Sequence, residues 1–191
     1  DRQGPGGVEQ TLRALEFVPD RPGMRIADIG CGTGGQTITI ARNRDCTITA
    51  VDLLPELLEE FRTRIKKAGL ENRVTAIQGS MDALPFSPGE FDVIWAEGSI
   101  YNIGFERGLR EWRQYLKPGG IIAVTECSWL SGARLASKFI SDYFPDIDSP
   151  SGKVRISPAG AFRAARALLD GKLLRPCKRT HPGIPQAIRA Q

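Results

Sequence analysis

The chain has 191 residues, of which 41% are hydrophobic and 25% are charged, with a formal net charge of +4 at pH 7. A chain of this size and composition can bury a sizeable core in one domain, so disorder over most of its length is excluded. It has no apolar run long enough to cross a bilayer and no signal-peptide pattern at its start, so we expect a soluble, cytoplasmic protein with no membrane partner.

Apolar runs alternate with amphipathic stretches from residue 24 to about residue 145, which is typical of βαβ units around a parallel sheet. Strands are expected at residues 24–29, 46–52, 73–78, 91–96 and 120–127. Helices are expected at residues 8–18, 36–42, 55–68, 105–117 and 132–143. This order predicts an α/β fold with a doubly wound, mostly parallel sheet and helices on both faces, in three layers.

Two of these helices are marked by particular residues. Pro55 suits the first position of the helix at residues 55–68, and Gly69 suits the left-handed residue that follows a helix. Its apolar face consists of Leu57, Leu58, Phe61 and Ile65. In the helix at residues 105–117, Trp112 lies on the apolar stripe, so we expect it in the core, and Lys117-Pro118-Gly119-Gly120 is expected to end that helix.

The pattern weakens after residue 156, where the charge balance also changes. Residues 151–191 hold nine Lys/Arg and one acidic residue, a balance of +8, which leaves seventeen Lys/Arg against twenty-one acidic residues, or −4, in residues 1–150. A basic tail can bind nucleic acid, but solvated charge without a partner is the commoner case. We expect residues 1–150 to form the core domain and residues 151–191 to form the edge of its sheet or a tail.

Cysteine and histidine are sparse. The four cysteines show no C-x-x-C spacing, and His181 has no neighbouring ligand. The sequence therefore predicts neither a metal site nor a disulfide framework. Because the first residue is Asp1 rather than methionine, we expect the natural start to lie upstream.

The segment Asp28–Gly35 falls at the first predicted strand-to-helix turn. Gly30, Gly32 and Gly35 satisfy G-x-G-x-x-G, and glycines there let the backbone turn sharply and approach a ligand closely. The following helix offers free N–H groups at its start. The segment predicts a nucleotide-cofactor site, although the glycine pattern alone also fits a dinucleotide-binding domain.

Carboxylates lie at or just after the carboxyl ends of three of the predicted strands. Asp52 can accept both hydroxyls of a ribose, and Asp82 can accept the amino group of adenine while Met81 packs on the ring. Asp28 can reach a cationic amino group, directly or through water. S-adenosylmethionine carries such a group and the nicotinamide cofactors do not. Asp82 alone could equally cap a helix.

Five motifs now resemble the class I S-adenosylmethionine-dependent methyltransferases. They are Asp28–Gly35, Val51–Asp52, Gly79–Phe86, Phe91–Glu97 and Leu116–Gly120. They occur in the family's order within about residues 8–148, and the blocks Glu97–Arg107 and Glu126–Trp129 are similar to a bacterial subgroup of small-molecule-type methyltransferases. The resemblance implies a Rossmann-like sheet of seven strands with a reversed last strand, although residues 151–191 show no two clear strands.

The resemblance also implies the residues that bind S-adenosylmethionine as the cofactor. Asp28 and the glycine turn would hold the methionine part, Asp52 the ribose and Asp82 the adenine. The full implied set is Asp28, Gly30, Cys31, Gly32, Gly34, Asp52, Leu53, Ser80, Met81, Asp82 and Glu97. Glu97 would also border the substrate mouth, or it could simply cap the next turn.

Methyl transfer from a sulfonium needs mainly an in-line nucleophile and a dry pocket, so an acid or base is optional. If the acceptor must lose a proton, Glu97 and Tyr101 are the candidate catalytic residues, and Asn102 is a candidate to orient the acceptor. Tyr101 could instead be a pocket wall. We expect no catalytic metal.

The predicted function is in-line transfer of a methyl group from S-adenosylmethionine to a small-molecule acceptor, by a monomer or homodimer. An RNA methyltransferase is an alternative, but the segment Ala96–Ser99 differs from the Asp/Asn-Pro-Pro-aromatic element of amino-methylating nucleic-acid enzymes, and the basic tail has no interleaved aromatics. An NAD-dependent oxidoreductase would need a second catalytic domain that is not evident. A non-catalytic binder of S-adenosylmethionine is a further alternative.

Overall fold

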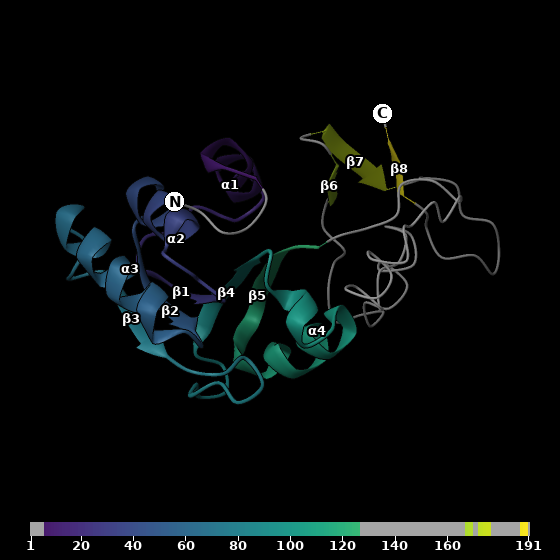
Figure 1. The fold of residues 1–191 in the computed structure, drawn as a ribbon. Helices are drawn as coiled ribbons and strands as arrows, with labels where there is room; N and C mark the ends of the chain where they lie inside the picture. The colour runs from purple at the N-terminus through teal and green to yellow at the C-terminus, as the bar shows by residue number, and fades with distance from the viewer. Residues whose placement is uncertain (1–5, 127–166, 170–171, 177–187, 191) are drawn as a thin grey trace, which may run out of the picture. The chain divides into compact units, whose positions relative to one another are not determined.

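The computed structural model describes residues 6–126, 167–169, 172–176 and 188–190. The chain divides into two compact units, residues 1–126 and residues 127–191. The helices of the first unit are α1 (Val8–Leu15), α2 (Gly35–Asn43), α3 (Pro55–Lys67) and α4 (Phe105–Trp112), with short 3-10 helices η1 (Ile100–Asn102) and η2 (Arg113–Tyr115) (Figure 1). Its strands are β1 (Met24–Ile29), β2 (Cys46–Asp52), β3 (Val74–Gln78), β4 (Phe91–Glu97) and β5 (Leu116–Thr125).

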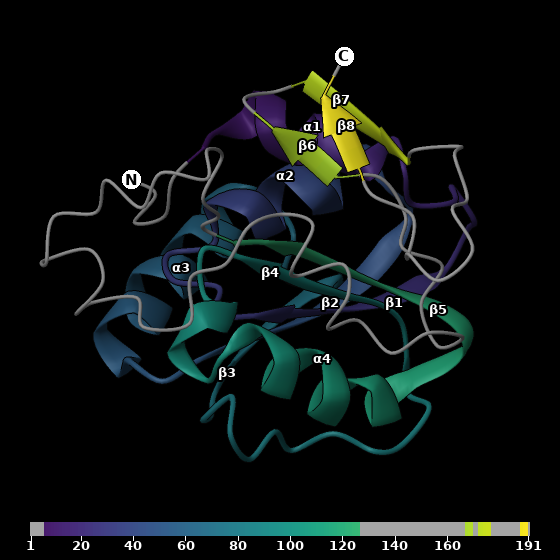
Figure 2. The ribbon, with the colours of Figure 1, turned by 90° about the vertical axis from the view of Figure 1, so that its right-hand side faces the viewer.

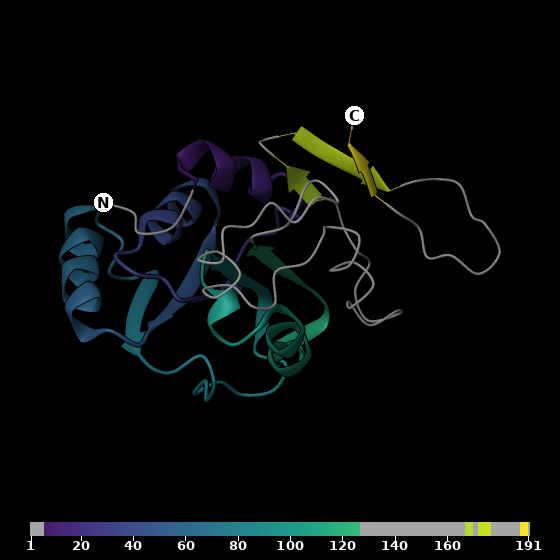
Figure 3. The same cartoon turned by 45° about the vertical axis from the view of Figure 1, so that its right-hand side comes forward.

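The five strands form one parallel sheet in the order β3-β2-β1-β4-β5. Helices α1, α2 and α3 cover one face of the sheet and α4 covers the other (Figures 1 and 2). Helix α1 packs on α2, an arrangement also visible in Figure 3. The predicted three-layer α/β fold is confirmed. Because the strand order reverses beside β1, the carboxyl ends of β1 and β4 flank a topological switch point.

The strands could be predicted from the sequence because strands that are buried on both faces consist mainly of apolar residues. In β1, the neighbours Ile26, Ala27 and Ile29 are all fully buried, as expected for a parallel strand covered on both faces. The largest buried side chains include Trp95 of β4 and Trp112 of α4, which confirms the prediction that Trp112 belongs to the core.

Helix α3 forms as predicted. Pro55 occupies its first turn, and Gly69 follows its end with a φ of +66°. Leu58, Phe61 and Ile65 are buried against the sheet. The helix therefore begins and ends where Pro55 and Gly69 indicate.

The predicted helix at residues 105–117 is wrong at its carboxyl end. Helix α4 ends at Trp112, and after η2 the chain is already in β5, which begins at Leu116 and not at residue 120. Between the pairs Phe91/Leu116 and Val93/Ile121 the register shifts, so Pro118 and Gly119 sit in an irregular stretch of the strand. A bulge at the edge of the sheet tolerates both residue types.

Other boundaries differ less. The helix predicted at residues 8–18 ends at Leu15, β3 begins at Val74, and β4 extends to Glu97. The end of β5 falls at Thr125, before the predicted residue 127. The helix predicted at residues 132–143 lies outside the described residues.

The described residues of the second unit form three short strands, β6 (Ala167–Leu169), β7 (Lys172–Pro176) and β8 (Ile188–Ala190). They pair antiparallel in the order β6-β7-β8. Within the described residues the parallel sheet therefore has five strands rather than the implied seven, and the antiparallel strands form a separate sheet. The role of residues 151–191 as a sheet edge or tail stays a prediction. A search of the described residues finds no helix long and apolar enough to span a membrane.

Candidate functional site

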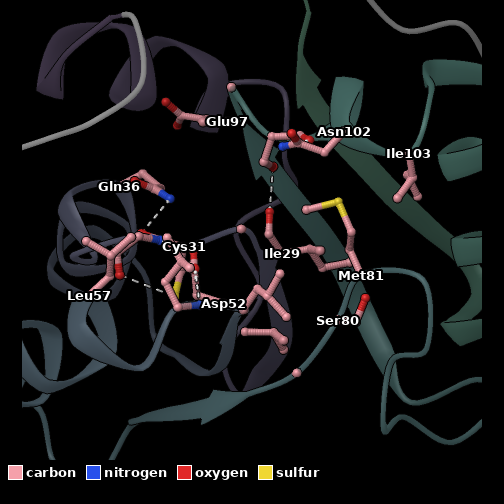
Figure 4. Close-up of a pocket in the computed structure, with 18 of the residues that line it drawn as sticks. Ile29, Cys31, Gln36, Asp52, Leu57, Ser80, Met81, Glu97, Asn102 and Ile103 are labelled. Carbon is pink, nitrogen blue, oxygen red and sulfur yellow. Dashed lines mark hydrogen bonds between the residues drawn. The ribbon is translucent and has the colours of Figure 1, made fainter.

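A cavity of about 590 Å³ opens at the carboxyl ends of the parallel strands (Figure 4). It is lined by the segments that follow β1, β2, β3 and β4. The volume is typical of a small-molecule site, and the crevice beside a strand-order reversal is where α/β sheets bind ligands. The cavity is therefore the candidate functional site of the first unit.

The turn after β1 forms the floor of this cavity. Gly30 and Gly32 adopt φ values of +75° and +54°, and the N–H groups of Gly30 and Cys31 donate to the carbonyl of Val51 at 2.8 and 3.0 Å. A Cβ at Gly30 would overlap Ser99, so the chain needs glycine there for both conformation and space. Gly30, Cys31 and Gly32 all line the cavity, as predicted.

Gly34 is placed differently. Its φ is +75°, and a Cβ on it would overlap the buried ring of Phe61. Gly34 is not among the residues that line the cavity. In the structure this glycine allows α2 and α3 to pack closely, and a ligand contact at Gly34 stays a prediction.

The carboxylate of Asp52 is fixed at the end of β2. Its Oδ2 accepts a hydrogen bond from the N–H of Gly32 at 2.7 Å, and its Oδ1 accepts one from the N–H of Leu54 at 3.1 Å. Asp52 lines the cavity together with Leu53 and Leu54, whose apolar side chains are 60% and 50% exposed. An anchored carboxylate beside exposed leucines suits a ligand with a polyol and an apolar ring.

The segment after β3 lies opposite the glycine turn. Ser80, Met81 and Asp82 all line the cavity. Asp82 is in a turn and not at the start of a helix, so the helix-cap alternative is not observed. Arg107 of α4 pairs with Asp82, with 2.7 Å between Nη1 and Oδ1.

Asp28 lies behind the cavity rather than in it. Its side chain is fully buried and accepts hydrogen bonds from the hydroxyl of Thr37 and, at 3.4 Å, from Nε2 of Gln36. Burial raises the pKa of Asp28 to about 7, with the Thr37 hydrogen bond opposing the rise and the charge of Glu97 adding to it. Gln36 lines the cavity and Asp28 does not, so direct contact between Asp28 and a ligand stays a prediction.

Glu97 ends β4 and borders the cavity, where it is only 7% exposed. Its Oε1 accepts hydrogen bonds from the hydroxyl of Thr11 and from the indole N–H of Trp95, both at 2.8 Å. Thr11 belongs to α1, so a helix at the start of the chain orients a carboxylate at the cavity. Figure 4 shows Glu97 at the top of the view, above Gln36.

The predicted catalytic residues Tyr101 and Asn102 lie on η1 and line the cavity with Glu97. Asn102 donates from Nδ2 to the carbonyl of Ser99 at 2.9 Å. Ser99 in turn donates its hydroxyl to the carbonyl of Ile29 at 2.7 Å, which joins this wall to the end of β1. The structure thus brings all three candidates to one wall.

Sequence analysis missed several lining residues. They are Ile29, Thr33, Gly35, Gln36, Val51, Leu54, Leu57, Gly79, Gly98, Ser99 and Ile103. Gln36 had a usable signal, since it follows the glycine turn in the first turn of α2. Leu57 was assigned to the packed face of α3, and only the structure shows that it reaches the cavity.

The residues present fit S-adenosylmethionine. The fixed Asp52 carboxylate suits vicinal hydroxyls, the Leu53 and Met81 side chains suit a flat ring, and Glu97 and Asp82 supply further acceptors. An acceptor-rich cavity complements a ligand that carries an ammonium and a sulfonium. The glycine turn lets the backbone come close to such a ligand.

The chain is similar in sequence to known proteins. Residues 26–120 match the sequence model of a methyltransferase domain family. The chain is 31% identical over 115 residues to 27-O-demethylrifamycin SV methyltransferase of Amycolatopsis mediterranei, covering 60% of this chain and 42% of that protein. It is 32% identical over 118 residues to the ubiquinone/menaquinone biosynthesis C-methyltransferase UbiE of Shewanella frigidimarina, covering 60% and 47%. The chain thus spans less than half of the length of these relatives.

A solved methyltransferase structure also matches the chain. Phosphoethanolamine N-methyltransferase 2 of Haemonchus contortus, in complex with S-adenosyl-L-methionine, superposes with a TM-score of 0.70 at 26% identity, covering 81% of this chain and 36% of that one. The residues matched by the family model contain the glycine turn and the strand ends described above. The chain belongs to the class I S-adenosylmethionine-dependent methyltransferases, and S-adenosylmethionine is its cofactor.

Proposed function

We propose that this protein transfers a methyl group from S-adenosylmethionine to a small-molecule acceptor. The observation that carries the proposal is the Asp52 carboxylate, fixed by two backbone N–H groups inside a cavity at the carboxyl ends of β1, β2 and β4. Two of the relatives, by their names, methylate a rifamycin and act in quinone biosynthesis, which supports a small organic acceptor.

In this proposal each part of the cofactor has its own contacts. Asp52 accepts the ribose hydroxyls, Leu53 and Met81 pack against the adenine, and Ser80 and Asp82 lie at its polar edge. The backbone of Gly30, Cys31 and Gly32 lies along the methionine part. Asp28 acts on that part through Gln36, because Gln36 lies between the buried carboxyl and the cavity.

The wall formed by Glu97 and η1 receives the acceptor. When bound, the cofactor supplies a methyl group activated by the sulfonium. Glu97, oriented by Thr11 and Trp95, is the candidate proton acceptor, and Tyr101 shapes the pocket beside it. Because Asn102 uses Nδ2 to hold Ser99, its carboxamide oxygen is the atom that can accept an O–H or N–H from the acceptor.

Calorimetric titration with S-adenosylhomocysteine, and separately with NAD, tests the cofactor assignment. We expect binding of the first ligand only, and a loss of about tenfold to a hundredfold in affinity for Asp52→Ala, since a charge-assisted hydrogen-bond partner is removed. Asp28→Ala is expected to weaken binding less, because it acts through Gln36. The matched control is Asp45→Ala, an exposed carboxylate just before the other end of β2. Unchanged affinity in both Asp52→Ala and Asp28→Ala would overturn the assignment.

Methyl transfer itself is tested with S-adenosylmethionine that carries an isotope-labelled methyl group, incubated with the protein and a cell extract that is afterwards separated into small-molecule and RNA fractions. Mass spectrometry is expected to find a labelled metabolite whose yield falls in Asp52→Ala. Label that enters only RNA would favour the nucleic-acid alternative instead. Binding of S-adenosylmethionine with no labelled product in either fraction would favour a non-catalytic binder.

A further inference from the structure

Helix α4 is tied to the cavity by three contacts, although no residue of α4 lines it. Arg107 pairs with Asp82 at 2.7 Å, and the indole N–H of Trp112 donates to the carbonyl of Met81 at 3.2 Å. At Gly108 a Cβ would come within 2.7 Å of Ile100, so the helix also packs tightly against η1. The segment after β3 is thus held from outside by α4.

Arg107 is itself positioned along its own helix. Its Nε donates to Oε1 of Glu111, one turn further on, at 2.9 Å, while Nη1 faces Asp82. A guanidinium is a planar fork, so fixing one N–H direction also restricts the direction of the others. The Arg107 side chain therefore presents its charge to Asp82 in a defined orientation.

The Asp82 carboxylate has weak constraints apart from Arg107. Its side chain is half exposed, and its Oδ2 is 3.3 Å from the hydroxyl of Ser80. Exposed ion pairs contribute little to folding stability, because water screens them. The consequence of the Arg107 pair therefore lies in the orientation of the Asp82 side chain at the cavity and not in holding the fold together.

We propose that Arg107 is a positioning residue for purine recognition. By holding Asp82, it aims a carboxylate at the exocyclic amino group of the cofactor's adenine and makes the site discriminate against a 6-oxo purine. This rests on the proposed contact between Asp82 and the cofactor. A 6-oxo purine presents an acceptor where adenine presents a donor, so an oriented carboxylate opposes it, whereas a freely rotating one can turn away.

The experiment measures calorimetric affinities for S-adenosylhomocysteine and for S-inosylhomocysteine, which differ in this group. We expect the unmodified protein to prefer the adenosyl ligand, and Arg107→Ala to lower that preference about tenfold. Arg107→Lys keeps the positive charge but lacks the planar guanidinium. It is expected to retain part of the preference that Arg107→Ala loses. Arg110→Ala, on the same helix but paired only with Glu111 among the described ion pairs, is the matched control and is expected to keep the full preference.

The outcomes separate this inference from the proposed function. If the unmodified protein binds neither ligand, the proposed function fails. If it binds the adenosyl ligand but shows no preference, or if Arg107→Ala keeps the preference while Asp82→Asn loses it, the role of Arg107 is overturned. A preference lost equally in Arg107→Ala and Arg110→Ala would also overturn it. Thermal unfolding of each variant checks that the fold is intact.

Discussion

Asp28 shows how one buried side chain couples the fold to pH. Its folded pKa of about 7 lies above the unfolded value near 3.8 because burial disfavours the anion, with Glu97 and Asp52 as the neighbouring charges that add to the rise. Between these two pH values the folded chain keeps a proton that the unfolded chain has released. Stability is therefore expected to fall as the pH rises from about 4 to about 7.

The size of this effect follows from the shift of about three units, which corresponds to a loss on the order of 4 kcal/mol across the window. Asp28→Asn, which cannot ionise, is expected to flatten the dependence in urea denaturation at a series of pH values. Asp92→Asn is the control. The N–H of Arg25 and the ammonium of Lys117 outweigh partial burial and lower the pKa of Asp92, so its contribution changes only below about pH 4. Equal slopes in unmodified protein and Asp28→Asn would contradict the assignment.

Single residues could be located from the sequence where their position along the backbone alone decides where they lie. Asp52 could be placed at the cavity because it ends a recognisable strand, and parallel strands all end at one edge. Asp28 lies one residue before the end of β1, and no local pattern reveals that its buried side chain is bonded to Thr37 and Gln36. The pairing of Asp82 with Arg107 joins two elements far apart in the sequence, so it also required the structure.

At the level of elements, Gly34 is where α2 and α3 meet. Its φ of +75° costs about 1–2 kcal/mol for a residue with a Cβ, and overlap with the Phe61 ring adds about 1–3 kcal/mol. We expect Gly34→Ala to lower the free energy of unfolding by about 2–5 kcal/mol, measured by chemical denaturation.

The matched control for this substitution is Gly23→Ala. Gly23 has a similar φ of +71°, but a Cβ there would meet no atom within 4 Å. It is expected to lose only the conformational part, about 1–2 kcal/mol. Equal losses in the two variants would show that Phe61 moves aside and that the helices are not tightly packed at this point.

The ends of helices and strands were predicted correctly where the local sequence signals are strong. The bounds of β1 and β2 match their predictions because each strand is a short, mostly apolar stretch that ends in a turn. The boundary between α4 and β5 was wrong because Pro118 and Gly119 are read locally as a chain break. Pairing with β4 keeps this stretch in the sheet through a register shift, and that long-range pairing leaves no mark on the sequence nearby.

At the scale of the whole molecule, the type of sheet and the location of the site were predictable together. Alternating strands and helices predict a doubly wound sheet, and such a sheet places its site at the carboxyl edge. The segment after residue 156 could not be predicted in the same way. Residues 163–191 are rich in Arg, Ala and Pro with little periodicity, so neither the length nor the pairing of strands there is specified locally.

The carboxyl ends of the parallel strands lie at one edge of the sheet and their amino ends at the opposite edge. This arrangement predicts how a bound ligand affects the whole first unit. At the carboxyl edge four segments line the cavity, and at the opposite edge Asp92 accepts hydrogen bonds from Arg25 and Lys117. A ligand that binds only the folded state suppresses local opening of the segments that it contacts. In hydrogen exchange with saturating S-adenosylhomocysteine, we expect slower exchange in four segments. They are residues 29–36, 51–57, 79–82 and 97–103.

Peptides that contain Arg25 or Asp92 but no cavity residue provide the internal reference and are expected to change little. Asp52→Ala at the same ligand concentration is expected to lose most of the protection in all four segments together, because it weakens binding and not one local contact. Uniform slowing at both edges would mean that the ligand acts by raising global stability alone. Protection limited to one segment would mean that the four strand ends do not form a single site.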